Sequence, residues 1–203
     1  MNESVFDDIF RLRKWGGNSV SGPGSTLQAT KQIRNELREF FKDFSIRSLA
    51  DTPCGDGIWI SELVDKLDLY LGGDIVSDIV HQNIENRFSD NQFFRIFDIS
   101  CDILPTVDAI LCRDCLVHFP FDLIFSTLRN FKKSGSRYLI TTSFPAHFSN
   151  IDIKIGGWRP LNLQIKPFNL PTPLRIMRER VDNPSDIYSD KSLLVWDLNS
   201  IFV

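Results

Sequence analysis

The sequence lacks an excess of positive charge. Its 203 residues include 23 Lys and Arg against 26 Asp and Glu, so the formal net charge is -3 at pH 7. Proteins that bind nucleic acid usually carry a basic patch, because phosphate contacts dominate their affinity. Basic residues cluster only in residues 175–180, Arg-Ile-Met-Arg-Glu-Arg, which we interpret as solvated surface. DNA and large RNA are therefore disfavoured as substrates.

Long apolar runs are also missing. No apolar stretch approaches the length of a membrane span, and the acidic residues 1–8 have neither the charge nor the apolar run of a signal peptide. We therefore expect a cytoplasmic protein with reduced thiols and no membrane partner.

Potential metal ligands are few. The chain has four Cys and three His, and Cys112 and Cys115 form a single C-x-x-C pair. A structural zinc site needs a second pair of ligands, and the sequence has neither a second C-x-x-C nor an H-x-x-x-H. We expect these thiols to pack in the interior and no metal to be bound.

The composition is that of an ordinary globular domain, with 42% hydrophobic and 24% charged residues. A chain of this length is expected to form one domain, residues 1–203. Strand and helix patterns alternate through its middle, which indicates βαβ units and a mostly parallel sheet with helices on both faces. The expected strands are 47–51, 69–74, 92–97, 107–112, 137–142 and 193–198, and the expected helices are 26–44, 58–67, 77–88 and 121–131.

Acidic residues follow three successive expected strands. Asp51 opens a turn that contains Gly55 and Gly57, and Asp74 and Asp98 follow the next two strands. Ligands of open α/β sheets bind beyond the carboxyl ends of the strands, and glycines let the backbone approach them closely. An acid at position 74 suits the two hydroxyls of a ribose, and Asp98 with an apolar neighbour suits an adenine. The alternative is that these acids only cap helices.

The turn does not fit a dinucleotide fingerprint or a P-loop. Ile60 stands where a third glycine is needed, and no Gly-Lys-Ser/Thr follows. Instead, residues 49–57, Leu-Ala-Asp-Thr-Pro-Cys-Gly-Asp-Gly, resemble motif I of class I S-adenosylmethionine (SAM) dependent methyltransferases. The resemblance extends over roughly residues 30–145. Residues 15–25, 112–118, 156–162 and 190–193 also resemble a group of small bacterial methyltransferases often associated with glycan or capsule biosynthesis.

The resemblance implies a fold, a cofactor and its binding residues. The fold is a Rossmann-like three-layer α/β/α sandwich with a mostly parallel seven-stranded sheet and an antiparallel C-terminal strand. The cofactor is SAM, with S-adenosylhomocysteine as product. Residues 1–26 are expected to form an N-terminal lid, although they read equally well as a loop before a helix. The expected cofactor-binding residues are Ser21, Gly22, Ser25, Asp51, Pro53, Cys54, Gly55, Gly57, Asp74, Ile75, Asp98, Ile99 and Arg113.

The segment after the fourth expected strand carries the candidate catalytic residues. His118 is the candidate general base, because imidazole titrates near neutral pH. Asp114 lies four residues earlier and is expected to orient the imidazole. Arg113 is expected to bind an anionic substrate or an acid in the pocket. His118 and Asp114 read equally well as residues at a helix start, and His147 is the reserve base.

The region 145–192 is expected to form an irregular insertion over the acceptor. Within it, Trp158 suits the face of a sugar and Arg159 suits a phosphate or carboxylate. The expected reaction is O-methylation of a small polar acceptor, such as a sugar or glycan intermediate, by a monomer or homodimer. The alternatives are an N-methyltransferase on a small amine or protein side chain, a non-catalytic SAM-binding or scaffold protein, and an NAD-linked oxidoreductase.

Overall fold

A seven-stranded sheet forms the centre of the protein, for which the computed structural model describes residues 2–16, 19, 21–87, 90–179 and 189–202. The strand order is β3-β2-β1-β4-β5-β7-β6, with β1 to β5 parallel and both β6 and β7 antiparallel to their neighbours. The strands are β1 (Ser48–Asp51), β2 (Leu69–Asp74), β3 (Gln92–Ile96), β4 (Ala109–Cys112), β5 (Tyr138–Ser143), β6 (Arg175–Arg178) and β7 (Ser192–Asp197). This confirms the expected α/β fold with its mostly parallel sheet.

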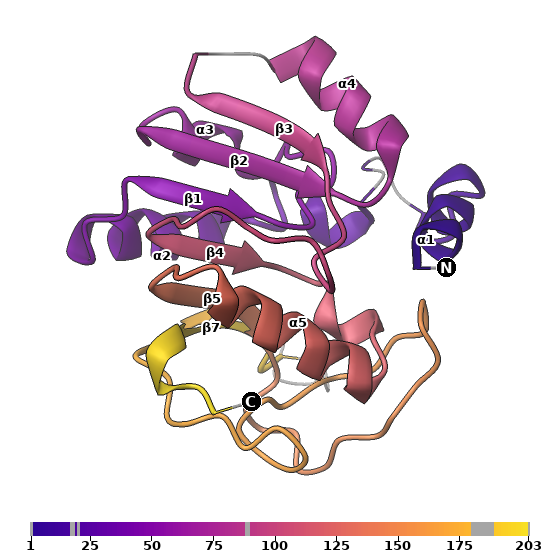
Figure 1. The fold of residues 1–203 in the computed structure, drawn as a ribbon, viewed down its shortest axis with the longest axis vertical. Coiled ribbons are helices and arrows are strands. Elements are labelled where there is room, and N and C mark those ends of the chain that lie inside the picture. The colour runs from indigo at the N-terminus through magenta and orange to yellow at the C-terminus, as the bar shows by residue number, and fades with distance from the viewer. Residues whose placement is uncertain (1, 17–18, 20, 88–89, 180–188, 203) are drawn as a thin grey trace.

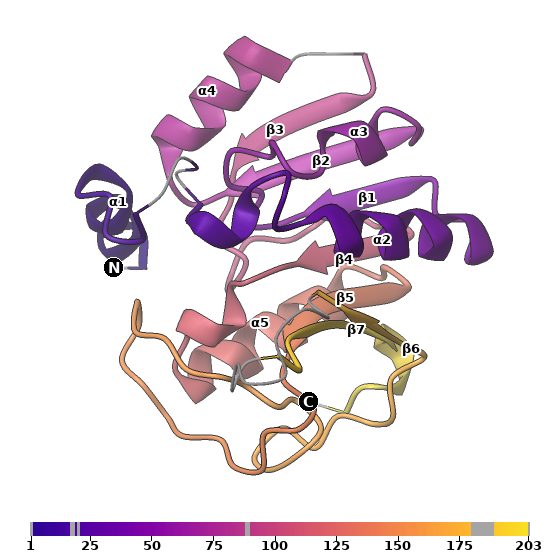
Figure 2. The ribbon, with the colours of Figure 1, turned by 180° about the vertical axis from the view of Figure 1, so that it is seen from behind.

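Helices cover both faces of the sheet and give the molecule three layers (Figures 1 and 2). The helices are α1 (Asn2–Arg11), α2 (Lys31–Asp43), α3 (Ser61–Val64), α4 (Ser77–Arg87) and α5 (Phe121–Lys133). Leu37 of α2 and Leu63 of α3 belong to one buried apolar cluster, whereas Ile124 and Leu128 of α5 belong to another. Apolar residues at helical spacing thus bury one stripe of each helix against the sheet.

Two helices begin later than the sequence pattern indicates. Helix α2 begins at Lys31 rather than at residue 26, because the hydroxyl of Thr30 donates to the Thr26 carbonyl and the Thr26 hydroxyl accepts from the Ala29 amide. Such local bonds compete with helix formation, and they leave Leu27 46% exposed. Helix α3 spans only Ser61–Val64, since the residues before it continue the glycine-containing turn.

The basic segment 175–180 is not simply solvated surface. Its first four residues form the edge strand β6, in which Met177 is fully buried while its neighbour Ile176 is half exposed. This alternation places one face of the strand against the core. The next residue, Glu179, is buried as well. A strand therefore lies within the region 145–192 that was expected to be irregular.

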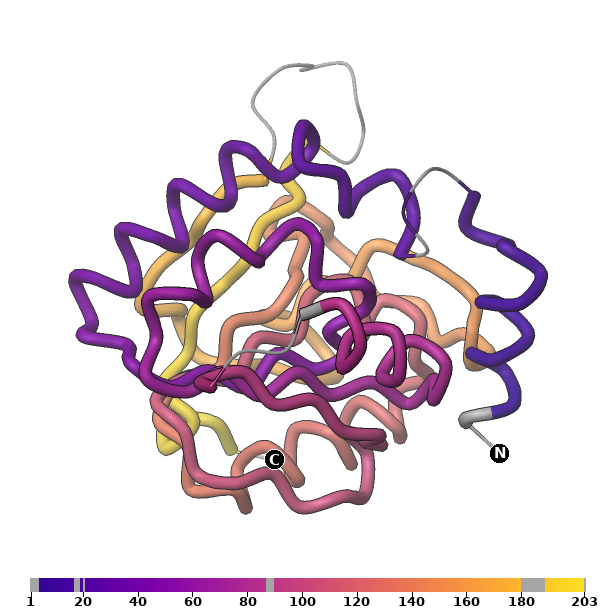
Figure 3. Tube along the Cα trace, turned by 90° about the horizontal axis from the view of Figure 1, so that it is seen from above, coloured from indigo at the N-terminus to yellow at the C-terminus, as the bar shows by residue number. Residues whose placement is uncertain are grey.

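Helix α1 lies beside the carboxyl ends of the parallel strands, away from the layer formed by α2 (Figures 1 and 3). A Cβ built on Gly156 would meet the side chains of Val5 and Ile9, so α1 packs closely on the loop that follows β5. Helix α1 and the loop that follows β5 thus meet near the carboxyl ends of the parallel strands (Figure 1). None of the helices that the structure describes is long and apolar enough to cross a membrane.

Candidate functional site

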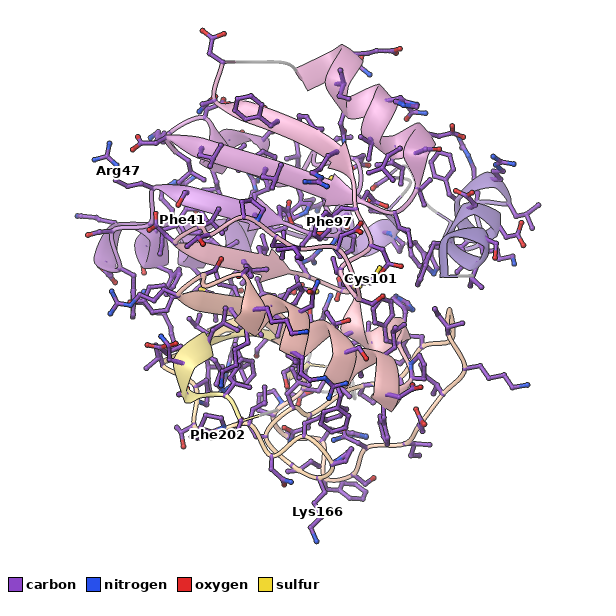
Figure 4. The ribbon with its side chains drawn as sticks, viewed as in Figure 1. Phe41, Arg47, Phe97, Cys101, Lys166 and Phe202 are labelled. Atoms are coloured by element: carbon purple, nitrogen blue, oxygen red, sulfur yellow. The ribbon has the colours of Figure 1, made fainter. Side chains whose placement is uncertain are left out.

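A cavity opens at the carboxyl ends of the parallel strands, where α1 approaches the sheet. The empty space between its walls is about 980 Å³, including its open mouth. Figure 4 shows Phe97, one of its wall residues, near these strand ends and Arg47 at the opposite side of the molecule. The described lining consists of Phe6, Phe10, Trp15, Ser21, Ser25, Asp51, Pro53, Cys54, Gly55, Trp59, Asp74, Ile75, Val76, Ile79, Phe97, Asp98, Ile99, Arg113, Asp114, Cys115, His118 and Phe119.

The turn after β1 is held tightly at Gly55. Its φ of 54° lies in the left-handed region, and a Cβ there would collide with the hydroxyl oxygen of Ser21. Its amide donates to Oδ2 of Asp74 at 3.0 Å, and its carbonyl accepts from Nδ2 of Asn83 at 2.7 Å. Only glycine fits this position, because both the backbone conformation and the close approach of the N-terminal segment exclude a side chain.

Two carboxyl groups are buried in the cavity wall. Asp51, only 1% exposed, accepts from the Tyr70 hydroxyl at 2.9 Å, and Asp74 accepts from the Val76 amide at 3.0 Å. Burial raises the pKa of Asp51 to about 7, although the Tyr70 hydroxyl and Arg113 oppose this shift. Burial likewise raises the pKa of Asp74 to about 6 against its backbone hydrogen bonds. Buried acids with raised pKa values in a cavity are typical of functional sites.

Apolar side chains line the cavity next to these acids. Ile75 and Ile99 come directly after Asp74 and Asp98, and with Phe97 they supply apolar walls of the cavity. Asp98 accepts from the Ser100 amide at 2.9 Å through Oδ1. We call the part of the cavity lined by Gly55, Asp74, Ile75, Asp98 and Ile99 the cofactor end. It brings together two carboxyl groups and two branched apolar side chains, where the sequence predicts the ribose and the adenine of a cofactor.

Arg113 lies in a network of four charged side chains, of which those of Arg113 and Glu179 are buried. It forms a two-point ion pair with Glu179, with Nε to Oε1 at 3.1 Å and Nη2 to Oε2 at 2.6 Å. Lys191 contacts both Glu179 at 3.2 Å and Asp114 at 2.6 Å. Burial raises the pKa of Asp114, but Lys191 and Arg113 outweigh this effect and lower it well below its ordinary value. Arg113 therefore pairs with an acid of the protein, which was one of its two expected roles.

The same guanidinium reaches the N-terminal segment. Its Nη2 donates to the Gly24 carbonyl at 3.0 Å and its Nη1 to the Ser25 hydroxyl at 3.4 Å, while the group lies over the Trp59 ring at 4.9 Å. The network thus ties the end of β4 to the hairpin of β6 and β7 and to residues 24–25.

His118 lines the cavity in the short 3-10 turn Leu116–His118. Its Nδ1 lies 2.7 Å from the Gly157 carbonyl, and its ring stacks on Trp15 with centroids 5.0 Å apart. Because a carbonyl only accepts, Nδ1 carries the proton and the neutral ring keeps its lone pair on Nε2. Burial lowers the pKa of His118 despite this hydrogen bond and the charge of Asp114.

Asp114 was expected to orient this imidazole, and the structure corrects that expectation. Its carboxylate forms ion pairs with Lys191 and Arg113, whereas the described hydrogen-bond partner of the His118 ring is the Gly157 carbonyl. The expectation assumed that both residues share one helical turn. Asp114 instead precedes the turn with a φ of 52°, which ends the helical spacing.

The N-terminal segment closes one side of the cavity. Phe6, Phe10, Trp15, Ser21 and Ser25 all belong to its lining. The Ser19 hydroxyl donates to Asp56 at 2.6 Å, and the Asp56 amide donates to the Ser21 hydroxyl at 3.3 Å, so the segment rests directly on the turn after β1. Described residues of the segment expected to form a lid thus line the cavity, and its action as a lid stays a prediction.

Five of the expected site residues are not part of the described lining. Gly22 follows the lining residue Ser21, and Gly57 lies two residues from both Gly55 and Trp59, with φ values of 88° and 56°. The guanidinium of Arg159 donates to the carbonyls of Leu116 and Phe119, which favours a structural role for it. Trp158 packs edge-on against Phe144 with centroids 6.2 Å apart. The ring of His147 lies tilted beside that of Phe148, with centroids 5.8 Å apart.

The four cysteines are free, and Cys112 and Cys115 are both buried, as expected for packing residues. Cys115 also contributes to the cavity wall. No group of three His, Cys, Asp or Glu side chains among the described residues is arranged to hold a metal ion.

Several residues of the site were not expected from the sequence. Phe6 and Phe10 stand four apart, a spacing that indicates an amphipathic helix but not which surface it covers. Asn83 of α4 and Glu179 reach the site from 28 and 66 residues away, respectively, from the groups they bind. Long-range pairs of this kind leave no local pattern, although a lone acid between arginines at 178 and 180 was the available signal for Glu179.

The fold resembles that of several solved methyltransferases. Magnesium protoporphyrin IX methyltransferase from Synechocystis PCC 6803, bound to S-adenosylhomocysteine, aligns with a TM-score of 0.65 at 14% identity, covering 96% of this chain and 98% of that one. The N-methyltransferase NodS from Bradyrhizobium japonicum WM9 aligns with a TM-score of 0.63 at 11% identity, covering 94% and 96%. The methyltransferase domain of bacterial CtHen1-C gives a TM-score of 0.64 at 11% identity, covering 85% and 98%.

At these identities the likeness establishes the fold. The chain thus has the three-layer architecture of these SAM-related methyltransferases, with its cavity at the carboxyl ends of the parallel strands. No protein-family model matches the chain, and the search of curated proteins found no significant relative.

Proposed function

We propose that this protein is a SAM-dependent methyltransferase that binds its cofactor in the cavity at the strand ends. The observation that carries the proposal is the arrangement of Gly55, Asp74 and Asp98 at three successive strand ends around one cavity. Structures of the same fold hold S-adenosylhomocysteine or SAM, as in the Synechocystis and Bradyrhizobium enzymes.

The residues present fit this cofactor. Asp74 would accept from the ribose hydroxyls, and the apolar side chains of Ile75 and Ile99 would face the adenine. Ser25 and Arg113, which line the same cavity as Gly55, would face the methionine end. When bound, SAM supplies a methyl group on a cationic sulfur, and the acceptor end of the cavity must bring a nucleophile to it.

His118 is proposed as the general base for a hydroxyl acceptor. Its Nδ1 is held by the Gly157 carbonyl, so Nε2 has the lone pair that takes a proton. The lowered pKa keeps the ring neutral at physiological pH, which is the form a base needs. O-methylation of a small acceptor is therefore the reaction that the site supports best, and a sugar or glycan intermediate is the acceptor proposed from the sequence.

The His118→Gln variant tests this role, because glutamine keeps a polar side chain but cannot take up the proton. We expect SAM affinity to stay unchanged while methyl transfer falls by about 100-fold or more, the typical contribution of a general base. Release of S-adenosylhomocysteine and calorimetric SAM binding are measured on the same samples.

Two alternatives predict different outcomes of that test. An N-methyltransferase acting on an amine that is already neutral would keep its activity in the His118→Gln variant. A non-catalytic SAM-binding protein would bind SAM but release no S-adenosylhomocysteine with any acceptor.

A further inference from the structure

A second part of the cavity, around His118, is walled by aromatic rings. We call the part lined by Phe6, Trp15, Asp114, His118 and Phe119 the acceptor end. The Phe6 ring lies 5.9 Å from Phe119 and 6.5 Å from Trp15, and Trp15 stacks on His118 at an interplanar angle of 28°. Phe6 is half-buried and Trp15 is 37% exposed, so each keeps part of its surface available to a ligand. Rings arranged in this way bind flat apolar groups by stacking and edge contacts.

Among the described residues of the acceptor end, only Asp114 and His118 have ionisable side chains, and each already has a protein partner. Each guanidinium nitrogen of Arg113 contacts a protein acceptor, so no anionic substrate needs to be assumed to explain its charge. Oδ2 of Asp114 accepts from Lys191 at 2.6 Å, and Nδ1 of His118 is bound to Gly157. A ring with many hydroxyls would leave several of them unpaired on burial, at a cost for each.

The pKa of imidazole at His118 is closer to that of a phenolic hydroxyl than to that of an alcohol. Phenolic hydroxyls have a pKa of about 10, far closer to that of imidazole than the pKa of an alcohol. Burial lowers the pKa of His118 and widens its difference from both hydroxyls equally, so the phenol stays the closer match. Proton transfer contributes most when the two pKa values are close.

From the ring geometry and the scarcity of polar partners, and on the basis of the proposed function, we infer that the methyl acceptor is a phenol. The flat ring of the acceptor lies among Phe6, Trp15 and Phe119, and its hydroxyl faces Nε2 of His118. In the reaction the phenolic oxygen forms a bond to the methyl carbon and its proton passes to Nε2. The bond between that carbon and sulfur breaks with its electron pair left on sulfur, so the cationic sulfonium becomes a neutral thioether. The inference replaces the sugar or glycan acceptor with an aromatic one.

A matched panel of acceptors tests the inference on the full-length protein. The probes are phenol, p-cresol and naphthol, with cyclohexanol as the non-aromatic match and methyl glucoside as the sugar. Binding is measured by saturation-transfer NMR on the protein loaded with S-adenosylhomocysteine, and methyl ethers formed with SAM are measured by mass spectrometry. We expect the phenols to bind and to be methylated, and cyclohexanol and methyl glucoside to do neither.

Variants locate the binding site of the phenols. Trp15→Ala and Phe6→Ala are expected to raise the KM for the phenol by roughly tenfold, in line with the loss of one aromatic contact, while SAM affinity is unchanged. Phe148→Ala is the matched control, because that ring is 89% exposed outside the described lining, and its KM should equal that of the wild type.

The outcomes separate the two proposals. Binding or methylation of methyl glucoside, equal binding of cyclohexanol, or absence of phenol binding would overturn the phenol class and leave SAM-dependent methyl transfer intact. Absence of SAM binding to the wild-type protein would overturn the proposed function, and the inference with it.

Discussion

At the scale of single residues, Asp74 is the most informative group of the site. Its two carboxyl oxygens accept from the amides of Gly55 and Val76, so it holds the turn after β1 in place while it lines the cavity. The side chain is 5% exposed, and burial raises its pKa to about 6. Its charge state therefore changes within an accessible pH range.

SAM affinity is expected to fall as the pH drops through about 6. Above that pH Asp74 is ionised and accepts strongly from ribose hydroxyls, whereas below it the carboxyl is protonated and accepts more weakly. Calorimetric titration at a series of pH values measures the effect. Asp51, with a pKa of about 7, titrates nearby, so the Asp74→Asn variant serves to separate the two groups. A pH dependence that persists near 6 in that variant would assign the effect to another residue.

The activity profile is expected to report His118. A base must be neutral to act, and burial lowers the pKa of this ring below the ordinary value of 6.5. The value of kcat/KM should therefore rise with pH on the acid side, with its midpoint below pH 6.5. The measurement is kcat/KM against pH with an acceptor that the protein methylates. A midpoint above that value would contradict the described environment of the ring.

Site residues could be predicted from the sequence where an acidic residue stands at the end of an expected strand. The positions of Asp51, Asp74 and Asp98 follow from the strand pattern, and all three line the cavity. The orientation of His118 did not follow, because its partner Gly157 lies 39 residues away in a loop without regular spacing.

At the scale of elements, the hairpin of β6 and β7 does more than extend the sheet. It carries Glu179 and Lys191 to the end of β4, where both join the network around Arg113. Arg113 in turn holds residues 24–25 of the N-terminal segment. Through these ion pairs, the hairpin stabilises the part of the cavity wall that contains Arg113.

Glu179→Gln is expected to lower the free energy of unfolding by about 3 kcal/mol, because it removes the two-point partner of the buried Arg113 cation and leaves only Asp114, 3.4 Å away, paired with it. Both side chains of the pair are at most 5% exposed. Asp68→Asn is the matched control, since it breaks the ion pair with Arg47 on side chains that are 58% and 72% exposed, and its effect should be negligible. Urea denaturation measures the free energy of unfolding of both variants. Equal changes in the two variants would mean that the network around Arg113 adds no stability.

Gly55→Ala is expected to abolish SAM binding and to destabilise the protein. The new Cβ would collide with Ser21, and the left-handed φ alone costs about 1–2 kcal/mol. Gly16→Ala isolates the cost of the left-handed φ, because Gly16 has a φ of 65° and no atom lies within 4 Å of a Cβ built on it. Melting temperature and SAM affinity are measured for both. If the two variants behave alike, the N-terminal segment does not rest on the turn as described.

The elements themselves were largely predictable, and their ends were not. Alternating strand and helix patterns located β1 to β5, β7 and four of the helices. Strand β6 is a basic edge strand of four residues, and only Met177 carries its buried face. The late start of α2 depends on hydroxyl bonds between Thr26 and Thr30 that apolar periodicity does not report.

At the scale of the whole molecule, segments that are far apart in the sequence meet beside the cavity. The N-terminal segment covers the carboxyl ends of the strands, and the hairpin near the C-terminus anchors that segment through Arg113. The sequence indicated the sheet and the cofactor end, because both rest on local patterns. The acceptor end combines Phe6 of α1 and Trp15 with the residues around the 3-10 turn at His118. Its aromatic character could not be predicted from the sequence, because these rings come together only in the fold.

The central claim is that the cavity binds SAM through Asp74, and isothermal titration calorimetry of SAM tests it most directly. We expect the wild-type protein to bind, and Asp74→Ala to lose about tenfold or more in affinity, as for removal of a charged hydrogen-bond acceptor. Asp78→Ala, which removes an exposed acid in the first turn of α4, should bind like the wild type. Equal affinity of Asp74→Ala and the wild type, or no binding by the wild type, would contradict the account.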